Sequence, residues 1–115
     1  MCIGEGKDLK IKLTDFGFAC FFNPDKKMDI SLGTPYYMAP ELVEARTYDE
    51  RVDVWSLGCI VYVLLSGKIP FSGNKIDDIA DAILTKEVDF DPINFSDVSF
   101  QAKQFISVCL TKNYE

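Results

Sequence analysis

The sequence contains no histidine, and none of its four cysteines stands in a Cys-x-x-Cys pair. A zinc site built by this chain alone is therefore not expected, because structural zinc sites use closely spaced Cys and His ligands. The longest apolar run, residues 54–65, is interrupted by Ser56. It falls well short of the ~20 residues that span a bilayer, so we expect no membrane partner. No secretory signal follows Met1, and we expect a reducing, cytoplasmic setting.

An excess of positive charge is also absent, because the net charge is -6. A nucleic-acid partner is therefore not expected, since a phosphate backbone requires a basic face. Hydrophobic residues make up 48% of the chain and charged residues 26%, which is typical of one globular domain with a real core.

Periodicity predicts a mainly α fold with a short β-hairpin at the start and about four to five helices. Residues 10–14 alternate polar and apolar side chains, which predicts a half-buried strand, and residues 1–3 are its expected partner. Residues 15–40 show no period and carry repeated Gly and Pro, which predicts a long loop of the kind that is usually functional. The expected helices cover residues 41–45, 49–65, 76–84 and 99–110.

The helix over residues 49–65 has good end signals, with Asp49 as its N-cap and Gly67 as its stop. Its apolar residues run almost all the way round, which predicts burial on every side. The helices at 76–84 and 99–110, the latter capped by Ser99, each carry a single apolar stripe. Such stripes indicate packing and nothing about function.

Three motifs occur in a specific order along the chain. A strand leads into Asp15-Phe16-Gly17, then Ala39-Pro40-Glu41 closes the loop, and Asp53-Val54-Trp55-Ser56-Leu57-Gly58 opens the long helix. Together they resemble the back half of the larger lobe of a eukaryotic protein kinase, and the resemblance covers essentially the whole chain. It implies a partial kinase domain over residues 1–115, divided into a hairpin remnant (1–14), an activation segment (15–41) and lobe helices (42–115).

The resemblance also implies roles for individual residues. Asp15 is the expected ligand of a magnesium ion that bridges the ATP phosphates. Phe16 is expected to be the packing residue that helps to set the active and inactive arrangements of the kinase, and Gly17 allows backbone angles closed to other residues. The expected substrate-receiving stretch is Gly33-Thr34-Pro35, in which Thr34 bonds the catalytic loop.

Other motif residues are expected to be structural. Glu41 resembles the glutamate of a buried ion pair with an arginine, and Asp53 resembles the aspartate that anchors the catalytic loop. Trp55 is expected in the core. The remaining members of the structural set are Ala39, Pro40 and Gly58.

The Thr34–Tyr37 stretch favours Ser/Thr specificity, and residues 62–71 resemble the calcium/calmodulin-dependent kinases, including calcium-dependent kinases with fused EF-hands. The chain holds no EF-hand loop, so control by calcium, calmodulin or an EF-hand stays open. The position that usually carries the activating phosphate, three residues before Gly33, is Ile30, which cannot be phosphorylated; Ser31 and Asp29 flank it.

Several parts of the kinase machinery are not found in the sequence. It has no Gly-rich loop, no third-strand lysine and no His-Arg-Asp catalytic loop. We expect the general base to precede Met1, and the arginine partner of Glu41 to follow Glu115. Two buried acids without partners, Glu41 and Asp53, then predict a poorly stable chain.

Two hypotheses follow. The parent is a Ser/Thr kinase that uses ATP and Mg²⁺ on protein substrates, while this chain alone is inactive and binds neither cofactor. Alternatively, the chain is a non-catalytic, pseudokinase-like binding module that captures partners through residues 31–41.

Overall fold

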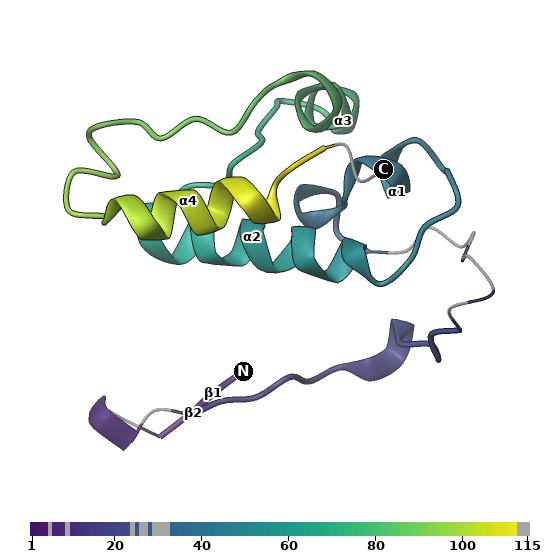
Figure 1. The fold of residues 1–115 in the computed structure, drawn as a ribbon, viewed down its shortest axis with the longest axis horizontal. Helices are drawn as coiled ribbons and strands as arrows, with labels where there is room; N and C mark the ends of the chain where they lie inside the picture. The colour runs from purple at the N-terminus through teal and green to yellow at the C-terminus, as the bar shows by residue number, and fades with distance from the viewer. Residues whose placement is uncertain (5, 9, 24, 26–27, 29–32, 113–115) are drawn as a thin grey trace.

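A computed structural model describes residues 1–112, with the exception of residues 5, 9, 24, 26–27 and 29–32. Within these described residues, four α-helices form the body of the molecule, and an N-terminal arm carries a two-stranded hairpin (Figure 1). The predicted mainly α class with a short hairpin is confirmed. The elements in chain order are β1 (Cys2–Ile3), η1 (Gly6–Asp8), β2 (Lys10–Ile11), η2 (Phe16–Phe18), η3 (Pro35–Tyr37), α1 (Pro40–Val43), α2 (Arg51–Ser66), α3 (Ile76–Thr85) and α4 (Phe100–Cys109), where η marks a 3-10 helix.

The hairpin pairs β1 and β2 in antiparallel fashion, with Cys2 opposite Ile11 and Ile3 opposite Lys10. The prediction of a half-buried strand is wrong, because Ile11 is 78% exposed and Leu13 is 85% exposed. The arm extends beside the helical body instead of packing into it (Figure 1), so neither face of the ribbon is covered by the described residues. Alternation of polar and apolar residues predicts a strand with one apolar face, but it does not show whether another element packs on that face.

Helix α2 begins and ends close to the predicted residues. The N-cap is Glu50 and not the predicted Asp49. The Asp49 carboxylate, one residue earlier, accepts a hydrogen bond from the Arg51 backbone N–H at 3.1 Å. The helix stops at Gly67, whose φ of 69° lies in the left-handed region that favours glycine.

Burial of α2 is one-sided. Trp55, Cys59 and Tyr62 are buried, and α4 packs along the same side. Gly58 permits this approach, because a Cβ at its position would lie 2.6 Å from the Cys109 Cβ. The prediction of burial all round is therefore wrong. On the opposite side, an apolar face stays open, formed by Val54, Leu57, Ile60 and Leu64, each more than 40% exposed.

The core lies between α2, α3, α4 and the loops that join them. Trp55 stacks on Phe71 with ring centroids 5.6 Å apart, and Tyr62 packs against Phe95 at 4.9 Å. Of the predicted stripe of α3, Ile79 and Ile83 are buried, whereas Ile76 and Leu84 are exposed; Ala82, outside that stripe, is buried as well. Ser99 caps α4 by accepting a hydrogen bond from the Ala102 N–H at 3.2 Å.

Across the described part of the chain, no helix has the length and apolar character needed to cross a membrane.

Candidate functional site

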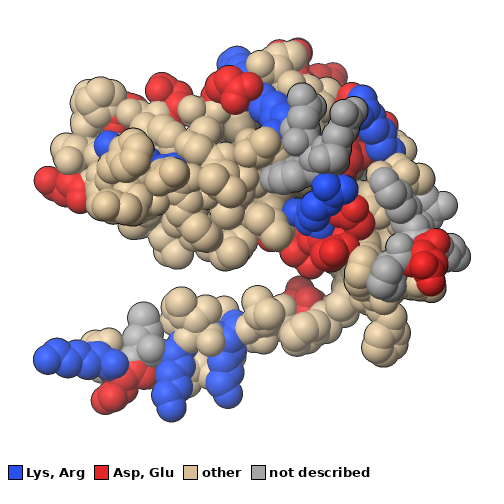
Figure 2. Space-filling view, viewed as in Figure 1, with Lys and Arg blue, Asp and Glu red and all other residues tan. Residues whose placement is uncertain are grey.

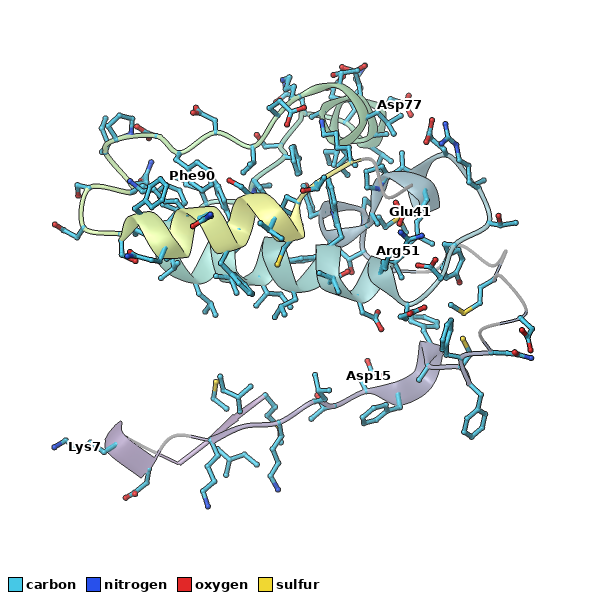
Figure 3. The ribbon with its side chains drawn as sticks, viewed as in Figure 1. Lys7, Asp15, Glu41, Arg51, Asp77 and Phe90 are labelled. Carbon is cyan, nitrogen blue, oxygen red and sulfur yellow. The ribbon has the colours of Figure 1, made fainter. Side chains whose placement is uncertain are left out.

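The first motif sits on the N-terminal arm, directly after the hairpin (Figure 3). Asp15 has φ 62° and ψ 71°, a left-handed conformation that aspartate tolerates better than most residues. Gly17 does not use the backbone angles that only glycine adopts easily, since the positive φ falls on Asp15. Gly17 serves another purpose: its position lies beside the Asp15 carboxylate, and a Cβ there would be 3.3 Å from Oδ1.

Asp15 presents its carboxylate to solvent as a single acidic ligand. Within the described residues, no group of three or more His, Cys, Asp or Glu side chains gathers to hold a metal ion. Magnesium is often bound through one or two carboxylates together with substrate phosphates and water. Asp15 therefore fits the part of one magnesium ligand but not of a complete site. Phe16 is 68% exposed and does not join the core.

The second motif region begins at Gly33, whose φ of 135° favours glycine. Thr34 is exposed, and the turn η3 follows it. This turn is fixed to α2 by the Ser56 hydroxyl, which donates to the Tyr37 carbonyl oxygen at 2.9 Å. Gly33 and Thr34 are therefore exposed at the surface, while the turn that follows them is hydrogen-bonded to α2.

Ala39 is fully buried and belongs to the core cluster, and the buried Pro40 starts α1 at a position where its missing N–H costs no hydrogen bond. Glu41 is half-buried, and its backbone carbonyl accepts a hydrogen bond from the Arg46 N–H at 2.9 Å. The structure fixes this motif by packing and by backbone bonds.

Arg51 lies close to Glu41 at the start of α2 (Figure 3). Its guanidinium forms a two-pronged ion pair with Asp49, with Nε–Oδ1 and NH2–Oδ2 distances of 2.9 Å. The pKa of Arg51 is raised, first by the hydrogen bond to Asp49 and further by the charges of Asp49 and Glu41. Glu41 therefore has a cation near it within the chain. Our sequence analysis did not single out Arg51, although an acid two residues before an arginine at a helix start was a usable signal.

Asp53 is exposed in the first turn of α2, where a negative charge is favourable near the helix N-terminus. No described acidic or basic side chain is buried. The expectation of two buried acids is therefore wrong for both Glu41 and Asp53, and the instability predicted from them loses its basis. Trp55, in contrast, is fully buried, as predicted.

One contact that holds the long loop in place could not be predicted from the sequence. Met28 and Tyr48 form an isolated antiparallel bridge with two N–H to C=O bonds of 2.9 Å each. It joins the loop to the connection between α1 and α2. Positions 29 to 31, where we considered a phosphorylation site, lie outside the described residues.

A groove of about 370 Å³ opens between η3, α1 and α3. Among the described residues that line it, Asp77 is the one acidic residue and the others are apolar. Figure 3 labels Asp77 on α3. We name this feature the η3–α3 groove. Its lining residues are Pro35, Met38, Leu42, Val43, Ile76, Asp77, Ile79, Ala80 and Ile83.

A comparison with known protein families identifies the family of this chain. The family model described as "Protein kinase domain" matches residues 2–115. The chain belongs to the protein kinase family. The resemblance seen in the order of the three motifs is thereby confirmed.

Curated relatives show which kinases this segment is similar to. It is 40% identical over 113 residues to a protein named as a probable myosin light chain kinase of Dictyostelium discoideum. It is 38% identical to calcium-dependent protein kinase 5 of Plasmodium berghei and 40% identical to myosin light chain kinase 2, skeletal/cardiac muscle, of Mus musculus. These matches agree with the predicted Ser/Thr kinases of the calcium-dependent group.

The kinase segment spans 98% of its own length in these matches but only 32%, 20% and 18% of the respective relatives. The activity, substrates and partners of a whole kinase are therefore taken up as proposals.

Proposed function

We propose that this chain forms the activation segment and lobe helices of a Ser/Thr protein kinase, which transfers the γ-phosphoryl group of ATP to protein Ser or Thr. The observation that carries the proposal is that the candidate metal ligand and two of the candidate substrate-receiving residues are exposed. Asp15 stands exposed on the arm, while Gly33 and Thr34 stand exposed on a stretch that Ser56 fixes to α2. A kinase needs a metal ligand and a surface for the substrate chain, and these residues supply one of each.

In this proposal Asp15 is one ligand of Mg²⁺, and Gly17 leaves room for its carboxylate. The metal would neutralise charge on the ATP phosphates. Gly33, Thr34 and Pro35 receive the substrate chain. Ala39, Pro40 and Trp55 are buried behind that stretch, half-buried Glu41 follows them in α1, Gly58 lets α4 pack closely on α2, and exposed Asp53 is available to bond a catalytic loop.

We propose further that these 115 residues are inactive alone and bind neither ATP nor Mg²⁺ tightly. The sequence contains no histidine and no third-strand lysine motif, and phosphoryl transfer depends on positioned charge. Calcium or calmodulin control and a cytoplasmic location complete the proposal, supported by relatives named as calcium-dependent or myosin light chain kinases and by four free cysteines.

The test is phosphotransfer from radiolabelled ATP to a serine-containing peptide, with and without calcium and calmodulin. It compares this chain with a longer one in which a lobe carrying a Gly-rich loop, a lysine and a catalytic loop precedes it. We expect activity only in the longer chain, and we expect Asp15→Asn to reduce it at least about a hundredfold, since transition-state electrostatics is the largest catalytic effect. Asp8→Asn, on the same arm, is the matched control.

Activity that survives Asp15→Asn would contradict the role of Asp15. A longer chain that transfers no phosphate, yet folds, would favour the non-catalytic binding module.

A further inference from the structure

Strand β2 of the arm has an outer edge that no described residue pairs with. Met1 and Lys12 exchange two backbone hydrogen bonds of 2.9 Å, from the Lys12 N–H to the Met1 carbonyl and from the Met1 amine to the Lys12 carbonyl. Hydrogen-bonded and non-hydrogen-bonded pairs alternate along an antiparallel ladder, so Ile11, opposite Cys2, turns its N–H and C=O away from β1. The chain continues in an extended run beyond β2 (Figure 1), and the same alternation applies to Leu13.

The two faces of this edge differ in chemistry. Side chains alternate along an extended strand, so Lys10 and Lys12 share one face while Ile11 and Leu13 share the other. All four are exposed. Figure 2 shows blue side chains gathered at the hairpin end of the arm, where Lys7 adds a third cation in η1. An unpaired backbone edge with a cationic face and an apolar face is therefore presented to solvent.

We propose that the outer edge of β2 binds an extended segment of another protein in which acidic residues alternate with valine or isoleucine. The segment adds as a third, antiparallel strand. Its apolar residues lie opposite Ile11 and Leu13 and exchange backbone hydrogen bonds with them, while its carboxylates lie on the face of Lys10 and Lys12. In strand addition, main-chain bonds supply affinity and alternate side chains supply specificity. The inference does not depend on the proposed function, because the edge involves none of the motif residues.

Charge favours a different protein over a second copy of this chain. Two β2 edges that paired with each other would place the lysines of one copy opposite those of the other, and like charges directly opposite are destabilising. Lysine on an edge strand is a common means by which proteins prevent such self-pairing. An acidic segment meets opposite charge at the same positions. The net charge of -6 disfavours that segment on the rest of the chain, which directs it to the arm.

A phosphate-bearing surface matches this edge less completely. The phosphates of nucleic acid or of an anionic lipid attract lysine. They accept hydrogen bonds but do not supply a regular row of donors for the Ile11 carbonyl, and they leave the apolar face of Ile11 and Leu13 in water. A strand uses the donor, the acceptor and both faces at once.

The binding test uses the 115-residue chain and a fluorescein-labelled peptide that carries Glu-Val-Glu-Val-Glu in a Gly-Ser background, followed by fluorescence anisotropy. We expect the reversed peptide, Lys-Val-Lys-Val-Lys, to bind at least about tenfold more weakly, because two attractions become repulsions. N-methylation of both valines removes the donors that the edge requires and leaves the charge unchanged. It should also weaken binding at least about tenfold. Neither comparison needs a protein variant, so the test stands even if a variant fails to fold.

Variants of the chain test the backbone edge and the charge separately. Ile11→Pro removes the outward N–H at an edge position, where proline is tolerated, and should weaken binding at least about tenfold. Ile11→Val is its matched control and should bind almost as well as the unchanged chain.

Lys10→Glu should weaken binding of the acidic peptide about fivefold and strengthen binding of the reversed peptide, since one exposed ion pair becomes a repulsion. Lys86→Glu makes the same charge change on an exposed residue directly after α3, on the other side of the helical body from the arm (Figure 1). It should leave the binding of both peptides unchanged.

Several outcomes would overturn the inference. Equal binding of the acidic and reversed peptides, or no binding of either, excludes the charge complementarity, and binding that survives N-methylation excludes strand addition. Vesicles of phosphatidylserine and phosphatidylcholine are a second probe: if they bind the chain but not Lys10→Glu, and the acidic peptide does not bind, the arm recognises a lipid surface instead. A dimer in sedimentation that Ile11→Pro abolishes would assign the edge to a second copy.

Discussion

The arm and the helical body obtain their structure in different ways. Every described residue up to Asn23 is exposed, including Phe16, Phe18 and Phe21, whereas the body buries Trp55 and Phe71 completely or nearly so. Figure 2 shows the arm as a thin rod beside a thick helical mass. The arm depends on local backbone preferences and hairpin bonds, while the body depends on the burial of apolar surface.

This difference separates two kinds of motif residue. Asp15, the candidate metal ligand, lies where nothing in the described chain packs on it, and its conformation is set by a local left-handed turn. Ala39, Trp55 and Gly58 lie in the body, where close packing leaves no room for other side chains. A residue that binds a ligand must be accessible, whereas a residue that fills the core is buried.

The largest expected effect comes from removing the same side chain in each region. Phe71→Ala should destabilise the chain by about 3–5 kcal/mol, because it leaves a cavity beside Trp55. Phe18→Ala should change stability by less than about 0.5 kcal/mol, since Phe18 is 71% exposed. Urea unfolding followed by Trp55 fluorescence measures both. Equal losses would show that the arm shares the core of the body.

A substitution at Gly58 tests close packing against helix propensity. Alanine is about 1 kcal/mol better than glycine in a helix, so propensity alone predicts stabilisation. We expect Gly58→Ala to destabilise by about 1–3 kcal/mol instead, because the new Cβ would meet the Cys109 Cβ at 2.6 Å. Gly58→Ala combined with Cys109→Gly should recover part of this loss. A gain of stability in Gly58→Ala alone would refute the tight α2–α4 contact.

Alkaline pH should weaken the body through its buried thiol. Burial raises the pKa of Cys59 to about 12, from an ordinary value of 9, against a smaller lowering by a backbone hydrogen bond. Well below pH 9 the thiol is neutral in both the folded and the unfolded state, and stability is unaffected. As pH rises from 9 towards 12, the unfolded chain ionises first, and stability should fall by up to about 1.4 kcal/mol per pH unit.

Denaturation curves across this pH range measure the slope. Cys59→Ala should reduce it, and a residual slope should remain, because burial also raises the pKa of Tyr62 and of Cys109. Cys2→Ala, on the exposed arm, should leave it unchanged. If both variants behave alike, the slope has another source.

The smallest expected effect concerns the bond that fixes η3 to α2. Ser56→Ala removes the donor to the Tyr37 carbonyl and should cost about 1 kcal/mol. Hydrogen exchange at Tyr37 and Met38 should also accelerate, while exchange in α4 stays slow. Thr85→Ala is the matched control, since its hydroxyl donates to the Asp81 carbonyl of its own helix. Unchanged exchange in Ser56→Ala would place the anchor elsewhere.

Much of the fold was predictable because its signals are local. Gly67 ends α2 and Ser99 caps α4 as expected, and the α3 helix forms where the period placed it, although only Ile79 and Ile83 of its predicted stripe are buried. The candidate site was predictable only as a set of motifs, since their order along the chain is a one-dimensional property. The groove was not, because Met38 and Val43 are far from Ile76 in sequence and come together only where α1 packs against α3.

The sequence by itself determined the family, the mainly α class and the ends of the helices, because motif order, apolar period and capping residues act over short distances. Only the tertiary structure decided which apolar residues of α2 are covered, that Asp53 is exposed, that Glu41 has Arg51 beside it, and that Asp77 faces a groove. The physical reason is the same in each case: burial and charge pairing depend on what a neighbouring element brings to the surface, and no local pattern records that.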